Sequence, residues 1–328
     1  MTAHLASRGA ALLAAMLTVA LVATLAAAGL WQQWRAIEVE AAERQRTQAA
    51  WVLVGALDWA RLILREDART GTIDHLGEPW ALALQEARLS TFLAADRHMA
   101  QSEAVGDTAF LSGDITDLQG RLNLLTLLEA GRVSPPALRA FERLFDLLGL
   151  PPAQLETLVT QLQRAASSRR DEGAAQLGVT TDTDTQQVPL MPARADQLGW
   201  LGLTPDTVAA LQPHVTILPG RTPVNLNTAN AQVVYAVISG IGLADAQRLV
   251  TARTQRPLQA PGDAARLVGQ AVADDTLVGF GSRFFEVRGR LRLDRAVIET
   301  RTLVQREGLN VTPLQHRRGA LDVPSAAT

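Results

Sequence analysis

Residues 8–35 read RGAALLAAMLTVALVATLAAAGLWQQWR, and no residue between the two terminal arginines is charged. At 1.5 Å rise per residue, the apolar run spans roughly 30 Å as a helix, which is the thickness of the hydrocarbon core of a bilayer. Trp31 closes the run and Trp34 follows, as in the interfacial aromatic belts of membrane helices. The stretch therefore predicts one transmembrane helix over residues 10–31.

A secretory signal peptide is the alternative interpretation of the same stretch. Its apolar core is only about 7–15 residues long and ends at a small-residue cleavage site, which the three alanines at 26–28 imitate. The leader, residues 1–9, carries His4 and Arg8 and no acid, so we expect it to stay in the cytoplasm and the rest of the chain to lie outside. The N-terminal residue of the membrane-extracted protein distinguishes the two interpretations.

The helix is expected to continue beyond the membrane. Residues 32–67 contain no Pro and a single Gly. Val52, Ala56, Trp59 and Ile63 recur at spacings of four, three and four, which makes one apolar stripe on a helix. We expect a single helix of about 55 residues whose second half packs on a globular head. A membrane helix followed by a separate helix is the alternative.

Composition excludes several kinds of chemistry. The 328 residues are 47% hydrophobic and 20% charged, about two domains' worth of globular protein. There is no Cys, which excludes disulfides and thiolate sites, and no Lys, which excludes a phosphate-binding loop and Schiff-base chemistry. The formal net charge of −2 gives no support to non-specific phosphate binding.

Strand patterns lie on both sides of a helical block. Residues 110–124 predict a strand–turn–strand with its turn at 117–120, and residues 283–305 alternate with period two around a turn at 294–295. Residues 309–314 add an edge. We therefore expect one α+β head, made of residues 32–124 and 276–316, interrupted by an all-α domain over residues 125–275. Two consecutive domains are the alternative, but they would leave the first hairpin without partners.

Two further segments are expected to lack regular structure. Residues 165–192 are polar and poor in large apolar side chains, so we interpret them as a long flexible loop. Residues 317–328 are interpreted as a flexible tail.

Three segments and the N-terminus carry a resemblance to a known family. An Arg-Gly pair before a long apolar helix is typical of the type IV pilin-like class. DHLGEPW (74–80), ITDLQGRLNL (115–124) and LPGRTPVNLNTA (218–229) resemble the K-type minor pseudopilins of the type II secretion system. The resemblance extends from about residue 8 to 310 of the printed sequence. It implies a pilin-like long helix with a small antiparallel β-sheet head and a large inserted all-α domain.

The resemblance also implies a location and partners. The chain would be a single-pass protein of the inner membrane with its head in the periplasm, at the tip of a short pseudopilus. Its partners would be the I- and J-type minor pseudopilins and the other pseudopilins of the fibre. Prepilin peptidase would cut between Gly9 and Ala10, since such peptidases cut after a Gly that ends a short charged leader.

The tip position rests on one substitution. Pilin-like subunits generally carry Glu at the fifth position after cleavage, where it can neutralise the N-terminal ammonium of a neighbour assembled earlier. This chain has Ala14 there, which fits a first subunit with no neighbour ahead. The expected contact with the I- and J-type helices is the stripe of Val52, Ala56, Trp59 and Ile63, or the face beside it.

A helix-hairpin-helix motif provides the alternative function. Residues 238–242 read ISGIG and are followed by LADAQRLVTAR, as in helix-hairpin-helix and SAM-like subdomains. DNA-binding versions present turn amides to a phosphate with basic residues behind them. Here Asp245 stands where a base would help, and Arg248 and Arg253 lie further along, where we expect them to be solvated. No nucleic-acid binding is expected; a membrane-anchored DNA-uptake protein is the alternative that this motif would support.

Catalytic motifs are missing from the sequence. The five His stand alone, and neither a nucleophile elbow nor a zinc-peptidase motif occurs. Asp74 and His75 are adjacent, but adjacent residues rarely point at one substrate atom, so a structural loop is favoured. We expect a non-enzymatic assembly subunit.

Calcium is the one cofactor that the resemblance raises. Relatives of this family bind Ca²⁺ near an acidic stretch from which this chain departs. The nearby arginines at 169–170 work against a cation, so the alternatives are a calcium site and a solvated loop. The remaining candidate ligands are Asp171, Glu172, Asp182 and Asp184.

Overall fold

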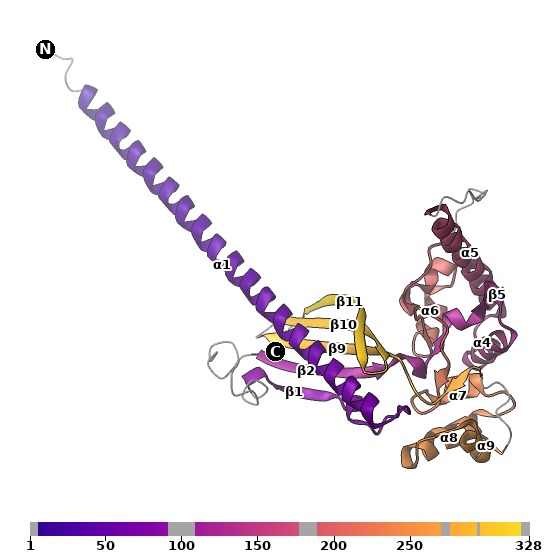
Figure 1. Ribbon diagram of the computed structural model, residues 1–328. Helices are drawn as coiled ribbons and strands as arrows, with labels where there is room; N and C mark the ends of the chain where they lie inside the picture. Colours follow the sequence, from indigo (N-terminus) through magenta and orange to yellow (C-terminus); the bar gives the residue numbers. More distant parts are fainter. Residues whose placement is uncertain (1–5, 91–108, 177–188, 270–275, 294–295, 323–328) are drawn as a thin grey trace. The chain divides into compact units, whose positions relative to one another are not determined.

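The computed structural model describes residues 6–90, 109–176, 189–269, 276–293 and 296–322. It divides into two compact units, residues 1–55 and 56–328. One helix, α1 (Ala6–Thr70), belongs to both, as the single-helix interpretation predicts (Figure 1).

In the first unit, the side chains of residues 10–48 of α1 are exposed, the apolar ones included. A window of this helix has a mean hydropathy of 2.3, and by length and composition the helix is a candidate to cross a membrane. An apolar helix that exposes its whole circumference needs a lipid or protein environment.

The head in the second unit is a five-stranded antiparallel sheet in the order β1-β2-β9-β10-β11 (Figure 1). In β9, Phe285, Val287 and Leu291 are buried whereas Arg288 and Arg290 are exposed, which is the period-two pattern of a half-buried strand. Strands from before and after the helical block therefore form one sheet, and the interrupted head is confirmed. The strands are β1 (Leu84–Arg88), β2 (Ala109–Asp117), β9 (Phe284–Leu293), β10 (Ala296–Glu307) and β11 (Asn310–Asp322).

The C-terminal end of α1 packs on this sheet. Ala60 and Leu64 are buried in a cluster with Trp80 and Phe285, whose rings meet edge to face at 5.3 Å and 70°. Each buried large side chain contributes about 1.5–3 kcal/mol, so this small cluster is what holds helix and sheet together. Its other members are Val287, Val304 and Val311.

The helical domain has a separate core. That core begins at Leu122 and ends at Val278, and its largest fully buried side chains include Phe141 and Phe145 of α4. The helices are α4 (Pro135–Leu148), α5 (Pro152–Gln176), α6 (Pro205–Leu211), α7 (Ala231–Val237), α8 (Leu243–Gln255) and α9 (Pro261–Val268).

Short elements connect these helices. Three two-stranded ladders pair β3 (Leu122–Asn123) with β6 (Val215–Thr216), β4 (Leu128–Glu129) with β5 (Arg132–Val133), and β7 (Val224–Asn225) with β8 (Val278–Gly279). The 3₁₀ segments are η1 (Pro79–Ala81), which precedes β1, and η2 (Leu118–Gly120), η3 (Leu124–Leu127) and η4 (Ala195–Leu201).

Local sequence explains where these helices begin and end. Pro stands at the start of α4, where its missing N–H costs nothing, and Gly149 ends the helix with φ +66°. The Asn230 side chain caps α7 by accepting from the Val233 N–H at 2.9 Å.

The structure corrects three expectations. β2 ends at Asp117, and β3 pairs with β6 rather than returning along β2, because Leu122 belongs to the core of the helical domain. The tail predicted at 317–328 is wrong through Asp322, since β11 pairs with β10 as far as that residue. The loop predicted at 165–192 is wrong in its first part, because α5 continues to Gln176.

Candidate functional site

A buried polar junction joins the head to the helical domain. The segments around Asp74, Asp117 and Asn225 meet there, although more than a hundred residues separate Asn225 from the other two. These are the segments that carry the resemblance described above. Ser282, just before β9, and Arg306 of β10 complete the junction.

Arg306 is the cation of the junction. Its guanidinium forms ion pairs with Asp67 at 2.7 Å and with Asp74, and it donates to the Ser282 carbonyl at 2.9 Å. The same group lies 4.9 Å from the centre of the Phe285 ring. Arg306 therefore ties the last turns of α1 to the loop after it and to β10.

Asp117 is the acceptor at the centre of the junction. Its carboxylate accepts from the hydroxyls of Ser282 and Thr228, both at 2.6 Å, and from the Asn225 amide at 3.1 Å. The other oxygen accepts from the Gln119 N–H at 2.8 Å and so caps η2. One side chain thus connects β2, the turn after it, the helical domain and the start of β9.

Burial raises the pKa of both carboxyls. Desolvation raises the pKa of Asp74 to about 6, although the Arg306 guanidinium lowers it. Desolvation also raises the pKa of Asp117, against hydrogen bonds from Ser282 and Thr228 that lower it. Perturbed carboxyls mark functional sites and structural networks alike. Here Asp117 is hydrogen-bonded to Ser282, Thr228 and Asn225, and Asp74 is paired with Arg306, which are the contacts of a structural network.

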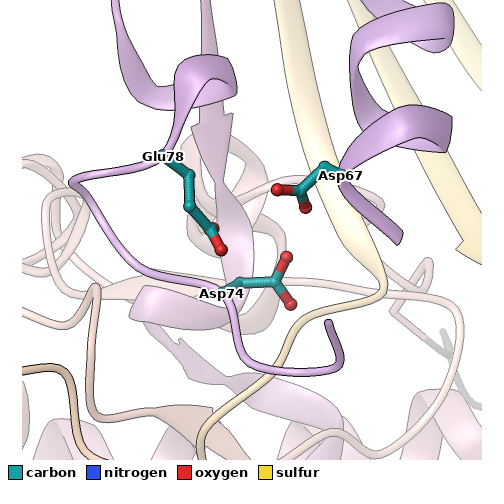
Figure 2. Close-up of side chains that lie close together, drawn as sticks. All are labelled: Asp67, Asp74 and Glu78. Atoms are coloured by element: carbon teal, nitrogen blue, oxygen red, sulfur yellow. The ribbon is translucent and has the colours of Figure 1, made fainter. Parts of the chain in front are cut away.

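Three carboxylates of the junction have the proximity of a metal site. Figure 2 shows Asp67, Asp74 and Glu78 turned toward one another, with ligand oxygens within 4.8 Å. The donor set does not fit a cation, however, because Arg306 already pairs with two of the carboxylates. Glu78 is engaged as well, accepting from the Trp80 indole at 2.7 Å and the His75 N–H at 2.9 Å.

The adjacent Asp74 and His75 do not act as a pair. The Asp74 carboxylate accepts from the Ser282 N–H at 2.6 Å, whereas the His75 ring lies 3.7 Å from Glu78. Trp80 is fixed between Glu78 and Phe285. The segment therefore has the contacts of a structural loop, as the sequence predicts.

Two glycines allow the chain to approach itself at the junction. A Cβ at Gly281 would overlap the carbonyl oxygen of Thr72, and one at Gly120 would come within 3.0 Å of the Thr228 hydroxyl. Only Gly permits backbone contacts this close.

The expected partner-contact stripe divides between two roles. Ile63 packs against the core of the head, so part of its surface is used within the chain. Trp59 is 50% exposed and Ala56 is partly exposed, while Val52 belongs to the first unit. Leu62, beside the stripe, is 48% exposed.

The other predicted site residues remain untested. Gly9 and Ala10 lie within α1. Asp171 and Glu172 lie in the last turns of α5. Asp182 and Asp184 lie outside the described residues. Calcium binding there stays a prediction.

The helix-hairpin-helix forms as expected, but the groups that could donate to a phosphate, the Gly242 amide and Arg248, are already bound to Asp245. Gly240 has φ +82°, and the Gly242 N–H donates to Asp245 at 3.0 Å. Arg248 pairs with Asp245. The expectation that Arg253 is solvated is wrong, because it is buried and donates to the Leu226 carbonyl. Its burial lowers the pKa of Arg253 to about 10.

Comparisons with known proteins agree with this architecture. The family models described as "Type II secretion system (T2SS), protein K" match residues 120–220 and 224–279, which closely follow the core of the helical domain. The type II secretion system protein K of Pseudomonas aeruginosa is 28% identical over 337 residues, covering 97% of this chain and 95% of that protein. This chain is therefore similar to the type II secretion system protein K family.

The fold of the protein K family agrees as well. A crystal structure of the GspK–GspI–GspJ complex from enterotoxigenic Escherichia coli contains a chain that matches with a TM-score of 0.60. The match is 20% identical and covers 85% of this chain and 98% of that chain. The long helix, the helical domain and the antiparallel sheet are therefore features of a known fold.

Sequence reasoning missed the centre of the junction. Arg306 and Ser282 stand in strand-like stretches with no pattern that separates them from surface residues. A polar residue at an inward position of a half-buried strand was the available indication, and it applies to Arg306 between Val304 and the turn at Gly308.

Proposed function

We propose that the chain is the minor pseudopilin at the tip of the periplasmic pseudopilus and supports protein secretion across the outer membrane. It acts as a non-enzymatic assembly subunit, with the I- and J-type minor pseudopilins as direct partners. Support comes from the similarity to the protein K family and from the fold of a solved chain whose complex contains GspI and GspJ.

The inserted helical domain is the observation that carries the proposal. It interrupts the sheet between β2 and β9 and has its own core, so its bulk cannot be folded into the head. The junction of Asp74, Asp117 and Arg306 holds it to the head through buried contacts. A rigid mass of this size next to the sheet would prevent a further head from stacking on it.

The helix supplies a second argument. A carboxylate within the apolar helix costs several kcal/mol unless it is paired. Counting from Ala10, the fifth residue is Ala14, so this subunit has no carboxylate with which to bind a neighbour ahead of it. The first subunit of a fibre is the one that needs none.

The membrane topology follows from the same helix. The chain is a single-pass protein of the inner membrane, with residues 10–31 in the bilayer and the head in the periplasm. Prepilin peptidase removes residues 1–9. Gly9→Val should leave the leader attached, as N-terminal sequencing of the membrane-extracted protein would show. A cut after Ala28 instead would overturn this topology.

Cross-linking tests the partner contact. Because the chain has no Cys, a single introduced Cys is the only thiol. Trp59→Cys should cross-link to the I- or J-type subunit in membranes that contain the assembled system. Gln255→Cys, exposed at the end of α8, is the matched control and should capture no pseudopilin.

The same pair of variants tests the tip position. A subunit within the fibre would have neighbours on both sides, so Gln255→Cys would also cross-link to a pseudopilin. That result would refute the tip position, and failure of Trp59→Cys together with the neighbouring Leu62→Cys would refute the helix contact.

A further inference from the structure

A cavity of about 440 Å³ lies between the sheet and the helical domain. Residues 193–196, 212–213 and 215–217 of the helical domain line one side, together with Leu118 and Arg121 from the turn after β2. The cavity is separate from the buried junction described above. The sheet side is lined by Glu286, Arg301, Leu303, Gln315 and Arg317.

The lining carries an excess of positive charge. Four arginines line the cavity, against the two acids Asp196 and Glu286. Both acids are already paired: Arg194 donates to Asp196 at 2.9 Å through two nitrogens, and Arg317 lies 3.5 Å from Glu286. Hydrogen bonds from Arg194 lower the pKa of Asp196, so this carboxylate stays ionised near neutral pH.

Two of these arginines retain unused donors. Arg301 hydrogen-bonds to Glu299 through Nε, and Glu286 and Asp114 attract it without a hydrogen bond, so its terminal nitrogens remain donors for another acceptor. Arg121 forms no ion pair with any acidic residue in the described part of the chain. Both therefore have N–H groups to offer to an anion in the cavity.

Strand register forces like charges together at the cavity wall. Arg301 of β10 is directly opposite Arg317 of β11, and like charges in opposed positions destabilise a sheet. Glu286 of the neighbouring β9 offsets part of this repulsion, since it lies 3.5 Å from Arg317 and attracts Arg301; an anion between the two guanidinium groups would relieve the rest. A planar oxyanion suits them best, because the guanidinium fork matches a carboxylate with two parallel hydrogen bonds.

The cavity has room for more than a single ion. Its volume is in the range of sites for organic ligands, and Leu118, Ile217 and Leu303 give it apolar walls. β11 lines the cavity through Gln315 and Arg317 and is the last strand of the sheet in the described residues, so its outer edge has backbone groups without a strand partner there. Such an edge accepts an extended peptide as an added strand.

We propose that this cavity binds a short acidic peptide segment of a partner protein, with the carboxylate between Arg121, Arg301 and Arg317 and an adjacent apolar side chain against Leu303. This assignment does not depend on the tip position in the pseudopilus.

The test uses the full chain in detergent and a fluorescein-labelled tetrapeptide with the order valine, leucine, glutamate, leucine. Fluorescence anisotropy should show saturable binding that weakens with added salt. The same peptide with glutamine in place of glutamate should bind at least about tenfold more weakly, since a hydrogen bond to a charged group is worth that factor or more.

Two variants locate the site. Arg121→Gln and Arg301→Gln should each weaken binding about tenfold. Arg121→Gln removes no ion pair described in the folded chain, so its loss of binding cannot be ascribed to a broken structural pair. Arg290→Gln, on the neighbouring strand β9, is the control, because Arg290 is exposed and outside the cavity; this variant should bind as the wild type does.

Three results would overturn the proposal. Equal affinity for the glutamate and glutamine peptides would show that charge is not recognised. Unchanged binding by both cavity variants would place the peptide elsewhere. Displacement of the peptide by an equimolar concentration of inorganic phosphate would show an oxyanion site that makes no use of the apolar wall or the strand edge.

Discussion

Arg306→Met is the substitution that examines the junction most directly. The side chains of Arg306, Asp67 and Asp74 are only 8%, 9% and 2% exposed, so their charges are almost fully removed from water. Removing one partner of such a pair leaves an uncompensated buried charge, which costs about 3–5 kcal/mol. Met retains most of the apolar stem of Arg and its contact with Phe285, so the loss would be electrostatic.

The loss should depend on pH. The folded-state pKa of Asp74, raised to about 6, lies above its unfolded value of about 3.9, so this group stabilises the fold fully below about pH 4. That contribution, about 3 kcal/mol, is lost as the pH rises through 6. Without the guanidinium the pKa of Asp74 rises further. The variant should therefore be closest to the wild type near pH 5 and furthest from it near pH 8.

The assay is urea unfolding of the full chain in detergent, followed by tryptophan fluorescence at pH 5 and pH 8. Trp80 lies in the same cluster and is 1% exposed, which makes it a local reporter. Arg288→Met is the control, because its ion pair with Asp114 is exposed and such pairs contribute about 0–1 kcal/mol. A loss below about 1 kcal/mol for Arg306→Met, equal at both pH values, would refute the electrostatic account of the junction.

Three further predictions concern other parts of the chain. Gly281→Ala should lower the melting temperature clearly, because the new Cβ overlaps the Thr72 carbonyl. Gly262→Ala is the control, since its Cβ meets nothing within 4 Å and should change the melting temperature little. Equal shifts for the two variants would contradict this. Calcium should not raise the melting temperature measurably, and a clear rise that Asp171→Ala abolishes would reveal a site by mass action. The full chain should not bind double-stranded DNA at about 150 mM salt, because the Gly242 amide and Arg248 are both bound to Asp245. Salt-sensitive DNA binding that Gly240→Val removes would disprove this prediction.

Local patterns were sufficient for much of the architecture. The uncharged run before Trp31 predicted the apolar helix, and the alternation in residues 284–305 predicted the hairpin of β9 and β10. Pattern failed where a short segment had no period of its own. Leu122 and Leu124 alternate as in a strand, yet both enter the core of the helical domain, because a run this short is compatible with several structures.

For the candidate sites as well, the sequence showed the local motif but not its distant partners. Asp74 and Glu78 were visible as a loop motif, but their partner Arg306 is separated from Asp74 by more than two hundred residues. The strand alternation marks Arg306 only as an inward polar residue and does not name its partners, since the cost of burying it is offset by carboxylates that the fold brings to it. The four cavity arginines likewise come from four separate segments.

By itself the sequence determined the elements whose free energy is local or repeats along the chain: the apolar helix, the alternating strands, the capped helices and the absence of thiol and lysine chemistry. Only the tertiary structure decided which strands share a sheet across the inserted domain, which carboxylates surround Arg306 and which arginines face one cavity. The physical reason is that buried charge and hydrogen-bond satisfaction depend on partners brought together by the whole fold, whereas periodicity and capping depend on neighbours within one or two turns.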